Sequence, residues 1–176
     1  DTQKNVSIYA NPSPTSLGFA ANSNTKDFVP SDYTAANAQN ILAYDMTGYG
    51  GFFSEESPAI SVSSDTASVN YANGQVNFTP NASGAMYFMV SFTADRAGDY
   101  YVNCRGNYVT KLRFYKNGQE IAYDRYQLQL FHIGQLEAGD YISVEYEYNN
   151  INGSEVAPFS VYTFHHPVFE NVYNTL

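Results

Sequence analysis

The sequence predicts an all-β protein: an antiparallel β-sandwich of jelly-roll type, with one N-terminal helix (about 32–47) and a short C-terminal helix (about 167–174). Three observations lead to this prediction. From Ala59 onward, apolar residues recur with a period of two, as they do in strands that have one buried face. Turn residues separate these runs at short intervals. The intervals leave no room for the crossover helices of a parallel sheet, which favours antiparallel strands in two layers.

Each expected strand is a short alternating run. Runs around Val69 and Val76 are joined by Asn73-Gly74, a pair that favours a type I′ hairpin turn. Short strands are also expected at Val6–Tyr9 and Ile60–Val62. Seven longer runs follow: Met86–Phe92, Tyr100–Cys104, Tyr108–Tyr115, Glu120–Tyr123, Gln127–Ile133, Tyr141–Tyr148 and Val156–Tyr162.

The N-terminal helix is predicted from its spacing and its ends. Ser31 or Asp32 can cap its first turn, and Gly48 can end it in a left-handed conformation. Between them, apolar residues recur at helical spacing: Ala35, Ala38, Ile41, Leu42 and Met46. Tyr49-Gly50-Gly51-Phe52 is then expected to turn the chain into the sheet.

The C-terminal helix is predicted to begin at Pro167, since proline suits the first turn of a helix. Its apolar face consists of Val168, Phe169, Val172, Tyr173 and Leu176. A chain of 176 residues without internal repeats or a long linker fits one domain, so we assign residues 1–176 to a single domain.

Charge and composition exclude several classes of function. The chain carries 17 Asp and Glu against 8 Lys and Arg, and this net charge of −9 repels nucleic acid and anionic lipid. We therefore expect no nucleic-acid partner. The longest apolar run, Ala85–Val90, is far shorter than the roughly 20 residues of a membrane span. Cys104 is the only cysteine, which excludes an internal disulfide and a multi-cysteine zinc site.

Residues with catalytic chemistry are present, but they form no convincing pattern. The three histidines are His132, His165 and His166, and the adjacent pair should point in different directions from an extended segment. Glu55 and Glu56, with Asp45 nearby in sequence, could supply a glycosidase acid and base, although charges flanking a turn are the simpler interpretation. We expect no catalytic residue, metal or cofactor.

Acidic residues at hairpin ends raise the possibility of calcium binding. These residues are Asp95, Asp99, Glu137 and Asp140, and they lack the regular spacing of a calcium loop. Ordinary turn roles are the better explanation, and calcium binding stays open as the alternative.

Tyrosines give the sequence a possible sugar-binding surface. The chain has 17 tyrosines and 12 phenylalanines but no tryptophan. An exposed aromatic ring can cover the apolar face of a saccharide. Tyr146 and Tyr148 are the main candidates, and Tyr123 and Tyr126 are further ones. Alternation along the strands must, however, place many aromatic residues in the core.

A series of short motifs runs along nearly the whole chain: Ile8–Asn11, Leu17–Phe19, Asn37–Asn40, Met46–Gly48, Met86–Phe88, Phe114–Gly118, Ile133–Leu136, Val161–Thr163 and Phe169–Tyr173. In this order, the series resembles the extracellular region of the bacterial YfhO membrane-protein family. Ser16 stands where that family usually has proline, and alanines replace the family's Pro-Phe pair before Gln39-Asn40.

This resemblance implies that the chain is one exoplasmic domain excised from a larger polytopic membrane protein. The membrane portion of that family looks like a lipid-linked-sugar-dependent glycosyltransferase acting on cell-wall polymers such as teichoic acids. The implied location is the extracellular face of the bacterial membrane, and the implied partners are the rest of the parent protein and a cell-wall glycan or neutral sugar. No catalytic residue of the family maps onto this chain.

Two roles compete for Asn37, Gln39 and Asn40, which match the family motif. They could tie loops to the sandwich, or they could form an edge that contacts the acceptor. Two functions also remain open. The chain could be a noncatalytic scaffold or acceptor guide within the membrane protein, or a secreted or cell-surface carbohydrate-binding or adhesion module.

Overall fold

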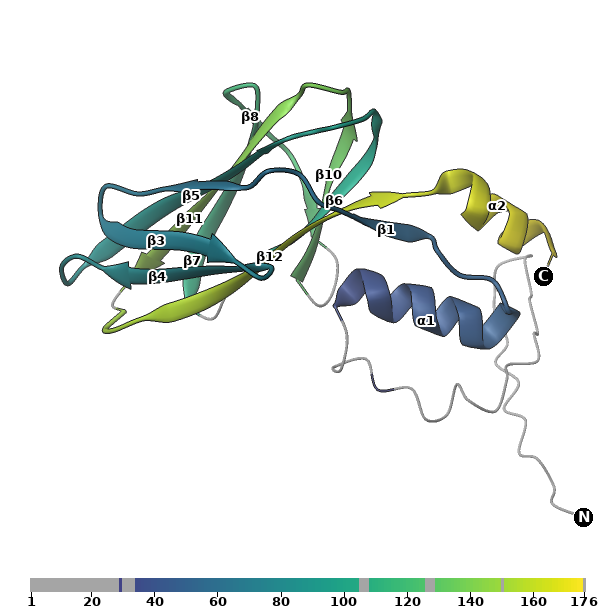
Figure 1. Ribbon diagram of the computed structural model, residues 1–176, viewed down its shortest axis with the longest axis horizontal. Coiled ribbons are helices and arrows are strands. Elements are labelled where there is room, and N and C mark those ends of the chain that lie inside the picture. Colours follow the sequence, from purple (N-terminus) through teal and green to yellow (C-terminus); the bar gives the residue numbers. More distant parts are fainter. Residues whose placement is uncertain (1–28, 30–33, 105–107, 126–128, 150, 176) are drawn as a thin grey trace, which may run out of the picture.

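A computed structural model of the chain describes residue 29 and residues 34–104, 108–125, 129–149 and 151–175. Two antiparallel sheets face each other, and two helices lie at one end of them (Figure 1). The first sheet runs in the order β3 (Ala67–Ala72), β4 (Gln75–Pro80), β12 (Glu155–Phe164), β6 (Gly98–Cys104), β10 (Leu130–Leu136) and β9 (Asp124–Arg125), with β1 (Phe53–Glu56) paired to β12. The second runs in the order β2 (Ser61–Ser63), β5 (Ala85–Thr93), β11 (Tyr141–Asn149), β7 (Val109–Lys116) and β8 (Gln119–Ile121).

The strand order confirms the predicted jelly roll. Strands β4, β12, β6 and β10 are neighbours in one sheet, and β5, β11, β7 and β8 are neighbours in the other. From β4 to β7 the chain changes sheet at every step, and it does so again from β10 to β12. Because the pairing partners are distant in sequence, the two sheets are interlocked by the chain path and share one core.

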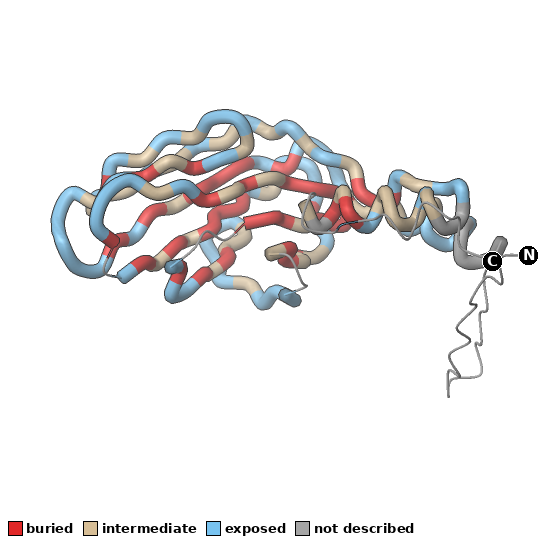
Figure 2. The backbone as a smooth tube through the Cα atoms, turned by 90° about the horizontal axis from the view of Figure 1, so that it is seen from below, coloured by how far each residue is buried: buried red, intermediate tan, exposed pale blue. Residues whose placement is uncertain are grey.

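The main core lies between the sheets, where alternate residues of each strand point inward. In β11, Ile142, Val144, Tyr146 and Tyr148 are fully buried, while the residues between them are more accessible or polar. The Phe88 ring stacks on both tyrosines, with ring centroids 4.6 Å and 5.5 Å away. Figure 2 shows buried positions running along the middle of the sandwich and exposed positions at its loops.

A second apolar cluster lies on the outer face of the first sheet, and it makes the helices part of the fold. Its buried members are Ala36, Phe52, Phe53, Leu130 and Tyr162. Ala43 of helix α1 (Ala35–Thr47) and Val168 of helix α2 (His166–Thr175) pack against it. The helices therefore form a third, partial layer over β1 and the end of β12.

Both helices were predicted, and their ends differ slightly from expectation. Thr34 caps α1 by accepting the Asn37 N–H on its hydroxyl at 3.4 Å. This bond gives the capping role to Thr34. Ser31 and Asp32, the predicted caps, lie outside the described residues. Gly48 ends α1 with φ of 76°, as predicted. Helix α2 begins one residue before Pro167.

The two Asn-Gly hairpin turns have the backbone geometry that this residue pair favours. Asn73 and Gly74 have φ of 52° and 74°, and Asn117 and Gly118 have 51° and 82°. Each pair joins two strands directly, as a type I′ turn does.

The predicted strand bounds deviate at several places. Strand β10 continues to Leu136, three residues beyond the prediction, because a bulge between His132 and Gly134 carries the pairing past a glycine. Strand β1 was missed, and Glu55 and Glu56 lie on it and not at a turn. The predicted strand Val6–Tyr9 lies outside the described residues.

Asp140 organises the turn between β10 and β11. Its carboxylate accepts hydrogen bonds from the Glu137 N–H at 2.7 Å and from the Asn117 side-chain amide at 2.8 Å, and it pairs with the Lys116 ammonium at 2.7 Å. These three donors lower the pKa of Asp140 from 3.8 to about 2, with the Lys116 hydrogen bond the largest cause. The turn role of Asp140 is therefore sufficient to explain this acidic residue.

The depressed pKa of Asp140 predicts an acid dependence of stability. A carboxyl with a lower pKa in the folded state stabilises the fold above its unfolded value of 3.8, and this contribution is lost as the pH falls toward about 2. We expect Asp140→Asn to lower the melting temperature at pH 7 and to flatten its decline between pH 4 and pH 2, measured by circular dichroism. Asp65→Asn, at an exposed position, is the control. Equal effects of the two substitutions would contradict this role of Asp140.

Candidate functional site

All three histidines of the chain lie at the helical end of the first sheet. The Asp99 carboxylate, on β6, accepts a hydrogen bond from His132 Nε2 at 2.7 Å and another from His166 Nε2 at 2.9 Å. The Asp99 residue is only 6% exposed, so its negative charge needs these two donors. This one carboxylate thereby joins β6, its neighbour β10 and the first residue of α2.

Aromatic rings fix the two histidines that face Asp99. The Tyr101 ring stacks on His132 with a centroid distance of 4.6 Å, and the edge of His166 meets the Phe164 ring at 4.8 Å. The Asp124 carboxylate is 3.8 Å from His132 Nδ1. His132 therefore lies between two carboxylates, and its orientation is set by stacking.

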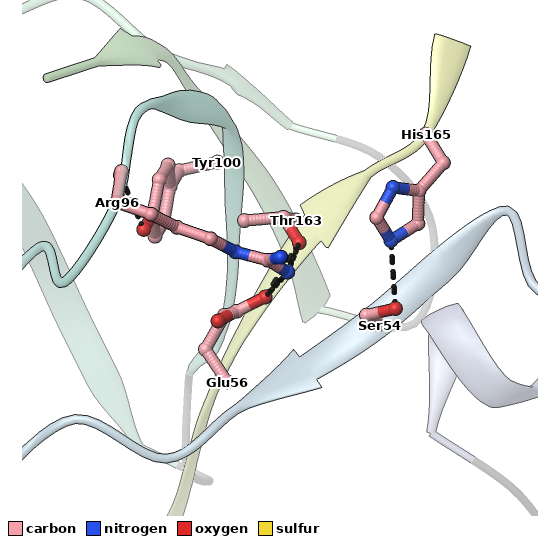
Figure 3. A network of polar contacts seen from close by, with 6 residues as sticks. All are labelled: Ser54, Glu56, Arg96, Tyr100, Thr163 and His165. Atoms are coloured by element: carbon pink, nitrogen blue, oxygen red, sulfur yellow. Dashed lines mark hydrogen bonds and ion pairs between the residues drawn. The ribbon is translucent and has the colours of Figure 1, made fainter. Parts of the chain in front are cut away.

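His165 points in another direction, as the alternation along the chain predicts. Its Nε2 forms a 2.7 Å hydrogen bond with the Ser54 hydroxyl of β1 (Figure 3). Its backbone N–H donates to the Phe52 carbonyl at 2.7 Å. The residue therefore fastens β1 to the end of β12 through both its side chain and its backbone.

The Ser54–His165 pair has the contact of a nucleophile and a general base, but it lacks the third member of a catalytic triad. Within the described residues, no carboxylate forms a hydrogen bond or ion pair with His165, and the Asp99 carboxylate bonds the other two histidines. The same part of the chain contains no group of three or more His, Cys, Asp or Glu side chains that could hold a metal ion. The arrangement supports a structural role better than a hydrolytic one.

A second polar network lies beside Ser54 (Figure 3). Arg96 pairs with the Glu56 carboxylate and donates to the Thr163 hydroxyl at 3.1 Å, and that hydroxyl donates to Glu56 at 2.6 Å. The hydrogen bond and charge of Glu56 raise the pKa of Arg96. Tyr100 donates to the Arg96 carbonyl at 2.9 Å. This network closes the gap between β1, β12 and the loop that precedes β6.

Glu55 and Glu56 do not form the facing pair of carboxylates that a glycosidase needs. Neighbouring residues on a strand point to opposite faces of the sheet, so these two carboxylates cannot face each other across a sugar. Glu56 is moreover engaged by Arg96.

A small cavity of 250 Å³ opens between the two polar networks. Arg96, Asp99, Thr163, His165 and His166 line it. This volume is below the roughly 300–1,000 Å³ of typical small-molecule sites. Most of the polar side chains that line this cavity already form hydrogen bonds within the chain.

Asn40 is the one predicted site residue with a clear structural task. Its side-chain amide donates to the Phe53 carbonyl at 2.8 Å, and its carbonyl oxygen accepts the Phe53 N–H at 2.9 Å. This pair of bonds reproduces the pairing of a neighbouring strand on the edge of β1 that faces away from β12. Of the two roles expected for the amides, Asn40 performs the one that ties the helix to the sandwich.

Asn37 and Gln39, the other two predicted amide residues, have no comparable structural task. Asn37 is half-buried in the first turn of α1, where its backbone N–H is bonded to Thr34. Gln39 is exposed, and its side chain has no hydrogen-bond partner among the described residues. An acceptor-contacting role for Asn37 and Gln39 stays a prediction.

The proposed tyrosine surface is corrected by the structure. Tyr146 and Tyr148 are fully buried between the sheets, so neither ring is available to a sugar outside the protein. Burial raises the pKa of Tyr146 well above its usual value, and Cys104 nearby adds to the shift. Both tyrosines share the inward face of β11 with Val144, which explains their burial.

Sequence reasoning missed the contacts of Asp99 with His132 and His166. These residues lie on β6, on β10 and at the start of α2, and they meet only through the pairing of distant strands. Of the three, only His132 stood out in the sequence, as a polar residue within the apolar run from Leu130 to Ile133.

The chain matches the family described as "Bacterial membrane protein YfhO" over residues 1–176. The chain belongs to the YfhO family. No curated protein is similar enough to be counted as a match.

Membership in YfhO confirms the family resemblance found in the sequence. The family is described as a membrane protein. Neither helix in the described part of this chain is long and apolar enough to cross a bilayer. The motif residue Asn40 is now explained by its bonds to Phe53.

The bonds of Asn40 give a direct stability prediction. Asn40→Ala leaves the Phe53 N–H and carbonyl without partners in a buried setting, and each such group costs about 1–3 kcal/mol. We expect the free energy of unfolding to fall by roughly 2 kcal/mol or more in urea denaturation. Gln39→Ala, one residue away and exposed, is the matched control and should change stability by less than about 0.5 kcal/mol. Equal losses in both variants would contradict the assignment.

Proposed function

We propose that this domain is a noncatalytic, exoplasmic module of a YfhO-family membrane protein, and that it serves as a scaffold or acceptor guide for a glycosyltransferase-like membrane portion. The family match along all 176 residues carries this proposal. The extracellular location and the transferase role extend the family resemblance noted in the sequence.

The polar groups of the site support a noncatalytic role. Asp99, Glu56 and Ser54 could each take part in catalysis, and each is bonded to a residue that joins strands or a helix. Catalytic groups need access to a substrate and freedom to transfer protons. These contacts instead hold β1, β12 and α2 together, as a scaffold requires.

The alternative of a secreted carbohydrate-binding or adhesion module loses its main candidates, because Tyr146 and Tyr148 are buried. It is retained as an outcome of the experiment below. The two functions differ in where the protein resides in the cell.

Cysteine labelling in intact cells tests the location. Glu120→Cys places a thiol at an exposed hairpin position of the full-length protein, while the native Cys104 is buried and should not react. We expect an impermeant maleimide to label the variant in intact bacteria, and the labelled protein to sediment with membranes. Labelling only after permeabilisation would contradict the exoplasmic location. Labelled protein in the medium would establish the secreted alternative.

Removal of the domain tests the role. We expect a full-length protein that lacks residues 1–176 to reach the membrane but to glycosylate cell-wall polymer poorly, measured by sugar analysis of the polymer. Unchanged glycosylation at equal membrane abundance would contradict a scaffold or guide role.

A further inference from the structure

The strands at the ends of the two sheets differ in length. Strand β3 has six residues, whereas β9 has two and β2 and β8 have three each. Short end strands give another chain little backbone to pair with. Among these four end strands, β3 therefore offers the substantial edge, and the β3–β4 hairpin lies away from the two helices (Figure 1).

The pairing of β3 with β4 shows which backbone groups face outward. Their two-residue turn closes on a hydrogen-bonded pair at Ala72, and hydrogen-bonded pairs alternate along an antiparallel ladder. The backbone N–H and C=O groups of Val69 and Tyr71 therefore point away from β4. The Ala67 N–H, which follows the same alternation, agrees with this assignment because it donates to the Ser64 hydroxyl at 2.9 Å. We call the outward backbone groups of Val69 and Tyr71 the β3 edge.

Side chains close other backbone edges of the sandwich but not the β3 edge. The Thr66 hydroxyl accepts the Tyr87 N–H of β5 at 2.8 Å, and Asn40 closes β1 in a similar way. Within the described residues, the outward backbone groups of Val69 and Tyr71 form no hydrogen bond. The β3 edge is thus open to a strand from another molecule.

The side chains at the β3 edge are incompletely packed. Val69 and Tyr71 point into the sandwich and pack against its core, yet both are only half-buried. Val62, on the end strand β2 of the facing sheet, is half-buried as well. A further strand beside β3 would cover apolar surface in addition to pairing backbone groups.

The charge distribution makes a second copy of the chain a fitting partner. No Asp, Glu, Lys, Arg or His occurs from Thr66 to Ala94, although the chain has a net charge of −9. Two such acidic chains repel each other in general, and this uncharged stretch lets them meet without like charges on the paired strands. A basic partner would instead be attracted to the acidic surface elsewhere.

We propose that two copies of the chain pair antiparallel through their β3 edges, so that the first sheet continues from one copy into the other. Two-fold symmetry sets Asn70 opposite Asn70 of the second copy, with each side chain on its own face. Val69 of each copy then forms a hydrogen-bonded pair with Tyr71 of the other. This register satisfies every outward backbone group of the β3 edge, and it places a β-branched and an aromatic side chain together on the buried face.

The alternative register, centred on Val69, is less suitable. It would set Tyr71 against Ala67 of the second copy, whose N–H is already bonded to Ser64. The proposed interface goes beyond the acceptor-guide function and does not rest on it.

Sedimentation velocity of the 176-residue chain tests the pairing. One strand pair makes a small interface, so we expect monomer at about 10 µM and dimer as the main species at about 1 mM. Asn70→Lys sets two lysines opposite each other and should raise the dissociation constant about tenfold or more. Gln75→Lys adds the same charge to an exposed position on β4, where salt screens it, and should change the constant by less than about twofold. Circular dichroism confirms folding of each variant.

Cysteine crosslinking tests the register. Asn70→Cys should form a disulfide with its own copy in the presence of copper phenanthroline, because residue 70 lies on the two-fold axis. Ser68→Cys should crosslink poorly with itself but readily with Ala72→Cys, which the proposed register sets opposite it. The native Cys104 is buried and should not react.

Several results would overturn the proposal. These are a chain that stays monomeric at about 1 mM, equal dissociation constants for the two lysine variants, or equal self-crosslinking of Asn70→Cys and Ser68→Cys. A monomeric chain whose Val69 and Tyr71 amide resonances shift saturably with an uncharged Thr-Val hexapeptide would also contradict it, and would assign the β3 edge to a different strand.

Discussion

The layer of helices depends on the two hydrogen bonds between the Asn40 side chain and the Phe53 backbone. Strand β1 is paired with β12 on one edge only, and an open edge exposes unpaired backbone groups. Asn40 closes this edge with a single side chain. The same contact positions α1 over Phe53 and Tyr162. Asn40 therefore both protects the edge of β1 and docks the helix.

Polar groups at the helical end hold separate parts of the chain together. The Asp99 carboxylate accepts hydrogen bonds from two histidines, and Glu56 pairs with Arg96 and accepts a hydrogen bond from Thr163. These contacts join β1, β6, β10, β12 and α2, which are far apart in the sequence.

Local patterns in the sequence predicted the fold well, because alternation and Asn-Gly turns act within a few residues. The alternation from Ile142 to Tyr148 also placed the tyrosines on the same face as Val144, so their burial was predictable. The contacts of Asp99 were not, since they need the register of β6 against β10 and the position of α2. The role of Asn40 likewise depends on β1, a strand too short to show a period.

Native-state hydrogen exchange at the Phe53 amide tests most directly whether Asn40 closes the edge of β1. That N–H donates only to Asn40 in the described structure, whereas the buried Val144 lies on β11, between β5 and β7 in the second sheet. The account predicts that Asn40→Ala abolishes most of the protection at Phe53 and leaves Val144 protected up to global unfolding. Unchanged protection of Phe53 in that variant would contradict the account.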